Sequence, residues 1–133
     1  MSLEKMMSLH PLAKREFDEL ALAARHAGLC SLMCTSCADA CLAEATSKDG
    51  QPDMRQTIRL TLDCADVCAM TAREAVRLTA YDADIRRRSL ELCIAACEAC
   101  VAECERQSQE HCRLCATMCR ECAEDCRKAL ASI

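Results

Sequence analysis

The sequence predicts an all-α fold: an antiparallel up-down-up-down four-helix bundle with an N-terminal helical extension and a cysteine-lined core. Three observations predict it. Two glycines, two prolines, one tyrosine and one phenylalanine in 133 residues argue against an all-β fold. Abundant Ala, Leu, Glu and Arg favour long helices. Finally, the cysteines recur at alternating spacings of three and four residues, which places them on one face of a helix.

Fifteen cysteines form four such series. The series are Cys30, Cys34, Cys37 and Cys41; Cys64 and Cys68; Cys93, Cys97, Cys100 and Cys104; and Cys112, Cys115, Cys119, Cys122 and Cys126. Each series runs along one helix face, so helices that turn these faces inward enclose a column of sulfur where other bundles keep leucines.

Breaker and capping residues set the expected helix bounds. The first cysteine-bearing helix should end near Ser47, where the stretch 47–52 gathers turn residues. Asp53 is a cap or first-turn acid for the second helix, which should run to about Thr79.

The third helix should be capped by Asp82 or Asp84, after a turn at 81–84. The polar run 106–109 should hold the turn into the last helix, which continues to about Leu130. Short connections of this kind imply antiparallel neighbours.

The N-terminal part of the first helix is too long to match the others, because its periodicity reaches back to about Pro11. We expect a break at 26–28, where His26 and Ala27 precede Gly28. This break divides the chain into an N-terminal extension, residues 1–25, and a cysteine-rich four-helix bundle, residues 26–133.

Antiparallel packing allows the cysteines to be aligned by height, counting from each turn. The expected levels are Cys30, Cys68, Cys93 and Cys122; then Cys34, Cys64, Cys97 and Cys119; then Cys37, Cys100 and Cys115 with Thr61; then Cys41, Cys104 and Cys112 with Thr57. Cys126 should lie beyond the first level, beside His26.

The chemistry of this column points to a soft metal. A core rich in cysteine and poor in large apolar side chains packs loosely unless something fills its axis. Thiolates select soft ions such as Cu(I), with Zn(II) and Fe–S clusters as the other candidates. One Cu⁺ for each buried thiolate neutralises its charge, so we expect roughly one Cu(I) per cysteine.

Other thiol chemistries stay open as alternatives. They are a zinc or mixed soft-metal sequestering protein, an Fe–S electron carrier, and a redox-sensing bundle. Structural zinc takes four ligands, which leaves most cysteines unexplained, and Fe–S ligands usually wrap around the cluster in a loop. A disulfide scaffold is disfavoured by the odd cysteine count and by the i, i+4 spacing, since Cβ atoms roughly 6 Å apart are too distant for a disulfide.

Several function classes lack any sequence signal. The net charge is −4 and there is no basic stripe, so we expect no nucleic-acid partner. The chain has no run of about 20 apolar residues, so we expect no membrane span. With no secretory signal visible, we expect a cytoplasmic protein. Without a Ser/His/Asp set or a glycine-rich phosphate loop, we expect no enzyme.

The repeated C-x-x-x-C and C-x-x-C spacings over roughly residues 26 to 130 resemble the four-helix-bundle copper storage proteins, especially the cytosolic bacterial branch, once a cysteine-rich domain of unknown function. The resemblance implies that all fifteen cysteines bind Cu(I) inside the bundle, that the chain forms a homotetramer, and that it stores, buffers and detoxifies copper. It also implies a copper donor or acceptor protein as a partner. The chain departs from the family pattern at Thr57, Thr61 and Thr71, so we expect lower capacity there and hydrogen-bond partners for these hydroxyls.

Four further residues are candidate metal ligands. His26 lies four residues before Cys30 and could bind copper where it enters, at the His26/Cys126 end, with Met70 as a weaker neighbour. His111 and Met54 lie toward the opposite end. The alternative for each is a polar or packing role at a bundle end. The run 86–88 of three arginines should form a solvated face or a subunit contact, with Arg86 near the cysteine seam.

Overall fold

The computed structural model describes residues 2–13, 18–47 and 53–133; the predicted turn within 48–52 lies outside the described residues. The described residues contain helices and no strand. The helices are α1 (Leu3–Ser8), α2 (Glu19–Ser47), α3 (Arg55–Ala75), α4 (Ala83–Cys104) and α5 (Glu110–Ser132).

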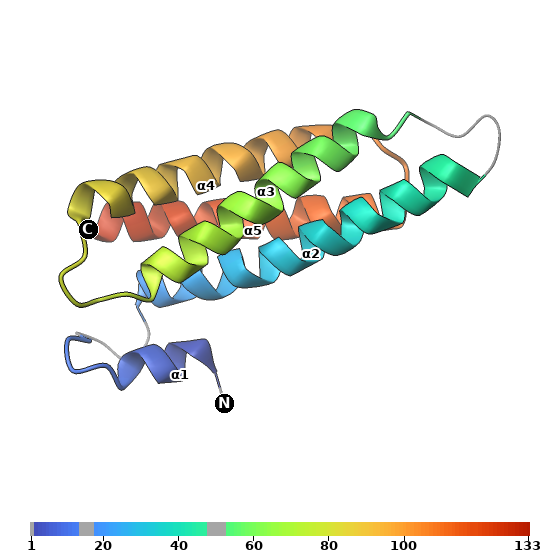
Figure 1. The fold of residues 1–133 in the computed structure, drawn as a ribbon. Helices are drawn as coiled ribbons and strands as arrows, with labels where there is room; N and C mark the ends of the chain where they lie inside the picture. Colours follow the sequence, from blue (N-terminus) through green and yellow to red (C-terminus); the bar gives the residue numbers. More distant parts are fainter. Residues whose placement is uncertain (1, 14–17, 48–52) are drawn as a thin grey trace.

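Helices α2 to α5 form a ring in which each packs against the helices before and after it, and α5 closes the ring on α2. Figure 1 shows these four helices running alongside one another, with the α3–α4 connection and the C-terminus at one end and the α4–α5 turn at the other. The predicted four-helix bundle is confirmed. The short helix α1 packs against α2 beside the first of these ends.

One of the two predicted helix starts is found at the expected acid. The Asp82 carboxylate accepts a hydrogen bond from the Ile85 N–H at 2.9 Å, which caps α4. The expectation for Asp53 was wrong: Met54 is the N-cap residue of α3, its first turn holds no acid, and the Asp53 carboxylate accepts from the Arg55 N–H at 3.1 Å from just outside the helix. The predicted turn between the last two helices is also present, since α4 ends at Cys104 and α5 begins at Glu110.

The end of α3 differs from our expectation, because this helix stops at Ala75 rather than near Thr79. Arg86 explains the earlier end. Its guanidinium donates to the backbone carbonyl oxygens of Glu74 at 3.2 Å and Arg77 at 2.7 Å, and the Glu74 carbonyl also accepts from the Arg77 N–H at 3.1 Å, so the carbonyls beyond the last helical turn are satisfied without a longer helix.

The helix break that we expected at 26–28 was wrong, because α2 runs without interruption from Glu19 to Ser47. A glycine inside a helix costs only about 1 kcal/mol relative to alanine. Burial of Ala23, Ala24 and Ala27 outweighs this cost, and all three are fully buried. The separate helix is α1 instead, and the division of the chain at residue 25 stays a prediction.

The core consists mainly of cysteine and alanine. All fifteen cysteines are buried, none more than 4% exposed. Six leucines that flank the cysteines in sequence are exposed on the outer surface: Leu29, Leu32, Leu42, Leu62, Leu92 and Leu114. Each lies one or two positions from a cysteine, so it is turned well away from the axis. The β-branched residues Ile58, Val67, Ile94 and Val101 are half-buried and pack against the core.

Arg86 is the largest fully buried side chain among the described residues, with 1% exposure. It does not lie on the solvated face that we expected for the arginine run. Besides its two carbonyl partners it contacts the Glu74 carboxylate at 3.2 Å and lies 3.8 Å from the centre of the Tyr81 ring. A buried arginine needs such partners because its charge is costly to remove from water. Through these contacts Arg86 joins the end of α3 to the start of α4.

No described helix has both the length and the hydropathy of a membrane span.

We expect Arg86→Ala to lower the free energy of unfolding of the metal-free protein by about 3 kcal/mol, because the partly buried Glu74 carboxylate and the carbonyls of Glu74 and Arg77 lose this donor. Denaturant unfolding followed by circular dichroism measures this change. Arg87→Ala is the matched control, since Arg87 is half-exposed and pairs with Asp84 on the surface. Its effect should stay within about 0.5 kcal/mol, and equal effects would contradict the role assigned to Arg86.

Candidate metal centre

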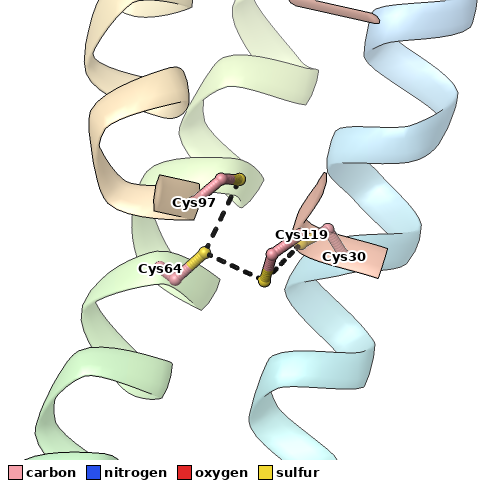
Figure 2. Close-up of side chains that lie close together, drawn as sticks. All are labelled: Cys30, Cys64, Cys97 and Cys119. Carbon is pink, nitrogen blue, oxygen red and sulfur yellow. Dashed lines mark hydrogen bonds between the residues drawn. The ribbon is translucent and has the colours of Figure 1, made fainter. Parts of the chain in front are cut away.

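The sulfur atoms of all four bundle helices meet on the axis of the bundle. Figure 2 shows one group, in which Cys30 of α2, Cys64 of α3, Cys97 of α4 and Cys119 of α5 point toward one another. The Sγ atom of Cys64 lies 3.8 Å from that of Cys97 and 3.9 Å from that of Cys119. The Sγ atoms of Cys119 and Cys30 are 3.7 Å apart. Each helix therefore contributes one thiol to the same small volume.

Further groups of the same kind follow along the axis. In each, the sulfurs lie within 4.8 Å of one another: Cys30, Cys68, Cys97 and Cys122; Cys34, Cys64, Cys100 and Cys119; and Cys37, Cys104 and Cys115. Because several cysteines belong to two groups, the groups merge into one continuous arrangement, which we call the sulfur column and define as the fifteen buried cysteines.

Cysteines that we expected at the same height are in contact, but the heights do not form separate layers. Same-level pairs are in contact, such as Cys68 with Cys93 at 3.7 Å and Cys34 with Cys119 at 3.6 Å. Diagonal pairs are equally close, such as Cys68 with Cys97 at 3.8 Å. The levels interlock because cysteine spacing alternates between three and four residues while a helical turn takes about 3.6.

Burial and hydrogen bonds between thiols shift the pKa values of the column in both directions. The hydrogen bond to Cys119 lowers the pKa of Cys30, and the hydrogen bond to Cys122 lowers that of Cys93. Burial is the main cause that raises the pKa of the Cys41 thiol, to about 12. The hydrogen bond to Cys100 raises the pKa of Cys34, and the hydrogen bond to Cys122 raises that of Cys68. An unpaired thiolate in this interior is costly, so a metal cation must displace the thiol protons when it binds.

The three threonines on the cysteine seam of α3 are fully buried and all hydrogen-bonded, as we expected. Thr61 donates to the Thr57 carbonyl at 2.7 Å, and Thr71 donates to the Val67 carbonyl at 2.9 Å. Thr57 donates to the Glu103 carboxylate at 3.0 Å. Their hydroxyls are therefore engaged with oxygen acceptors, and this side of the column offers fewer soft donors.

His111 joins the column at the end that holds the α4–α5 turn. Its Nδ1 lies 3.2 Å from the Cys37 sulfur and 3.6 Å from the Cys112 sulfur, and its Nε2 lies 2.8 Å from a Glu44 carboxylate oxygen. The donor atoms of four residues lie within 4.8 Å of one another here: Cys37, Cys41, His111 and Cys112. A surface cavity of about 190 Å³ is lined by Cys37, His111 and Cys115 among others, so this end of the column is reached from solvent.

The other candidate ligands are placed differently. His26 Nδ1 contacts the Asp125 carboxylate, so this nitrogen faces oxygen rather than sulfur. Cys126, at the same end, is buried and hydrogen-bonds with Cys122 and Cys93. Met54 is fully buried near the opposite end, whereas Met70 is 42% exposed and its sulfur accepts a hydrogen bond from Ser89 at 3.3 Å.

Three carboxylates that the sequence analysis did not single out border the column. Glu44 contacts His111, Asp125 contacts His26, and Glu103 accepts from Thr57. A signal was present, because each lies three residues after a cysteine and so continues a cysteine seam. These acids orient the histidines and one of the threonines from outside the column.

Comparison with known proteins agrees with this geometry. A family model described as copper storage protein matches residues 17–131. The copper storage protein Ccsp from Streptomyces lividans, loaded with 10 copper equivalents, shares 37% identity, with a TM-score of 0.88 over 99% of this chain and 100% of that one. No curated protein sequence matches the chain.

A second Streptomyces lividans structure concerns copper loading of a cytosolic copper storage protein with five coppers. It is 41% identical, with a TM-score of 0.79, and the alignment covers 86% of this chain and 94% of that one. A Ccsp variant with two histidines replaced by alanine is equally similar, at 41% identity, a TM-score of 0.79, and coverage of 86% and 95%. The sulfur column, the bundle and the match over most of the chain lead to one conclusion: the protein belongs to the copper storage protein family.

Proposed function

We propose that this protein stores copper as Cu(I), roughly one ion per cysteine, and so buffers and detoxifies copper in the cytosol. The observation that carries the proposal is the sulfur column itself, in which every thiol is buried and neighbouring sulfurs lie 3.6–3.9 Å apart. Soft thiolates select Cu(I), and Cu(I) accepts two or three sulfur ligands that can bridge neighbouring ions. One related Ccsp structure was loaded with 10 copper equivalents, and another concerns loading with five coppers.

Charge balance favours a monovalent ion in the middle of this column. One Cu⁺ for each thiolate leaves the interior neutral. One Zn²⁺ for four thiolates leaves two negative charges in a region where the sulfurs are fully buried. The Fe–S alternative gains no support, because the cysteines lie along helices rather than in a loop that could wrap a cluster.

We propose that copper enters at the His111 end, in place of the His26/Cys126 end favoured from sequence. His111 combines partial exposure with direct contact to column sulfurs, and the cavity beside it reaches Cys37. His26, in contrast, pairs with Asp125, and helix α1 packs near it through the Arg25–Glu4 ion pair. Met54 and Met70 then serve packing rather than ligation.

We also propose that the chain forms a homo-oligomer, a tetramer by resemblance to its family. Six leucines on the outer surface are exposed, among them Leu29 and Leu32 of α2 and Leu114 of α5. Burying them between copies would remove this apolar surface from water.

Anaerobic titration of the reduced protein with Cu(I) should reach saturation near fifteen ions per chain, with slow loss to a high-affinity chelator. Absorbance from sulfur-to-copper charge transfer and metal analysis measure the endpoint. Saturation at one or two ions would refute the storage proposal.

Cys97→Ala should lower the copper capacity by at least one ion, because Cys97 belongs to two four-sulfur groups. Thr61→Ala is the control on the same seam; it should leave capacity unchanged, since the Thr61 hydroxyl donates to a backbone carbonyl. Equal capacities for both variants and the parent protein would show that copper lies outside the column.

Copper loading at neutral pH should release close to one proton per ion, because buried thiols such as Cys41, with its pKa raised to about 12, are protonated before the metal arrives. Competition by protons should therefore weaken apparent Cu(I) affinity as pH falls. A pH indicator in weakly buffered solution counts the protons. Loading without proton release would mean that the column already holds thiolates.

A further inference from the structure

The geometry at the α4–α5 end of the column points to a second kind of metal site, and we propose that Cys37, Cys41, Cys112 and His111 bind one Zn(II) ion. These four residues place three sulfurs and one imidazole nitrogen within 4.8 Å of one another. Three thiolates and one histidine are a ligand set typical of tetrahedral zinc. The site shares three thiols with the sulfur column, so zinc bound there competes with copper for those thiols.

The distances between the donor atoms fit a zinc tetrahedron. Zn–S bonds of about 2.3 Å and Zn–N bonds of about 2.0–2.1 Å separate two sulfurs by about 3.8 Å, and sulfur from nitrogen by about 3.6 Å. The Cys112 sulfur lies 3.9 Å from Cys37 and 3.9 Å from Cys41. The His111 Nδ1 lies 3.6 Å from Cys112 and 3.2 Å from Cys37. Only small adjustments bring these atoms onto one ion.

Glu44 prepares the histidine for this role. Its carboxylate oxygen lies 2.8 Å from His111 Nε2 and favours the tautomer in which Nε2–H donates to it, which leaves Nδ1 free of a proton and near the sulfurs. A carboxylate behind a ligating histidine fixes the ring and raises its basicity, an arrangement common at zinc sites.

Charge distinguishes this site from the all-cysteine groups farther along the column. Zinc with three thiolates and a neutral imidazole carries one net negative charge, whereas zinc with four thiolates carries two. The His111 side chain is 31% exposed, so solvent reaches the charge of the zinc site. His111 and Cys112 also lie in the first turn of α5, where the helix dipole favours a negative charge. The all-cysteine groups are fully buried and have neither compensation.

The test uses the reduced, metal-free full chain and Co(II), which reports tetrahedral thiolate coordination through visible d–d bands. We expect one Co(II) per chain with intense tetrahedral bands, followed by stoichiometric displacement by Zn(II). His111→Ala should weaken Co(II) binding at least tenfold and shift the bands, and Glu44→Gln should weaken it about tenfold with little spectral change. His26→Ala, which alters the other histidine–carboxylate pair, should change neither.

Two outcomes would overturn the proposal. One is the absence of tetrahedral bands. The other is a spectrum that changes in Cys97→Ala but not in His111→Ala, which would place the ion in an all-cysteine group. The Cu(I) capacity of the same preparations is measured separately, so a failed zinc site and a failed copper column give different results.

Discussion

The cost of burying thiols without a cation is the constraint on which the rest of this structure depends. Fifteen sulfurs occupy the axis where a bundle usually gains its stability from large apolar side chains. In the metal-free protein the thiols share hydrogen bonds with one another, and burial disfavours any thiolate without a partner. A bound cation supplies that partner.

Stability must then come from outside the axis. Alanines on the helix faces beside the cysteines allow close contact between neighbouring helices, and half-buried β-branched residues complete these contacts. The α3–α4 connection is held by Arg86, a buried cation whose partners are two carbonyls, one carboxylate and one aromatic ring.

The two ends of the column are chemically different, although each has a histidine paired with a carboxylate. At one end His26 pairs with Asp125 and the short helix α1 packs nearby. At the other, His111 turns one nitrogen to Glu44 and the other to sulfur, beside a cavity. If copper enters at this end, as proposed, a soft ion arriving from solvent meets a mixed nitrogen and sulfur site before it meets sulfur alone.

The sequence by itself determined the helical fold, the inward cysteine faces and the approximate heights of the sulfurs. Each of these follows from local spacing, because three- and four-residue intervals specify a helix face whatever the helix packs against. Asp82 as a cap follows for the same reason. Tertiary structure decided what local spacing cannot express. Packing of Ala23, Ala24 and Ala27 kept α2 continuous through Gly28, and Arg86 ended α3 early from a position eleven residues beyond Ala75. It also decided which histidine meets sulfur. His26 and His111 look alike in the sequence, and only the neighbouring helices bring Asp125 to the first and Cys37 to the second.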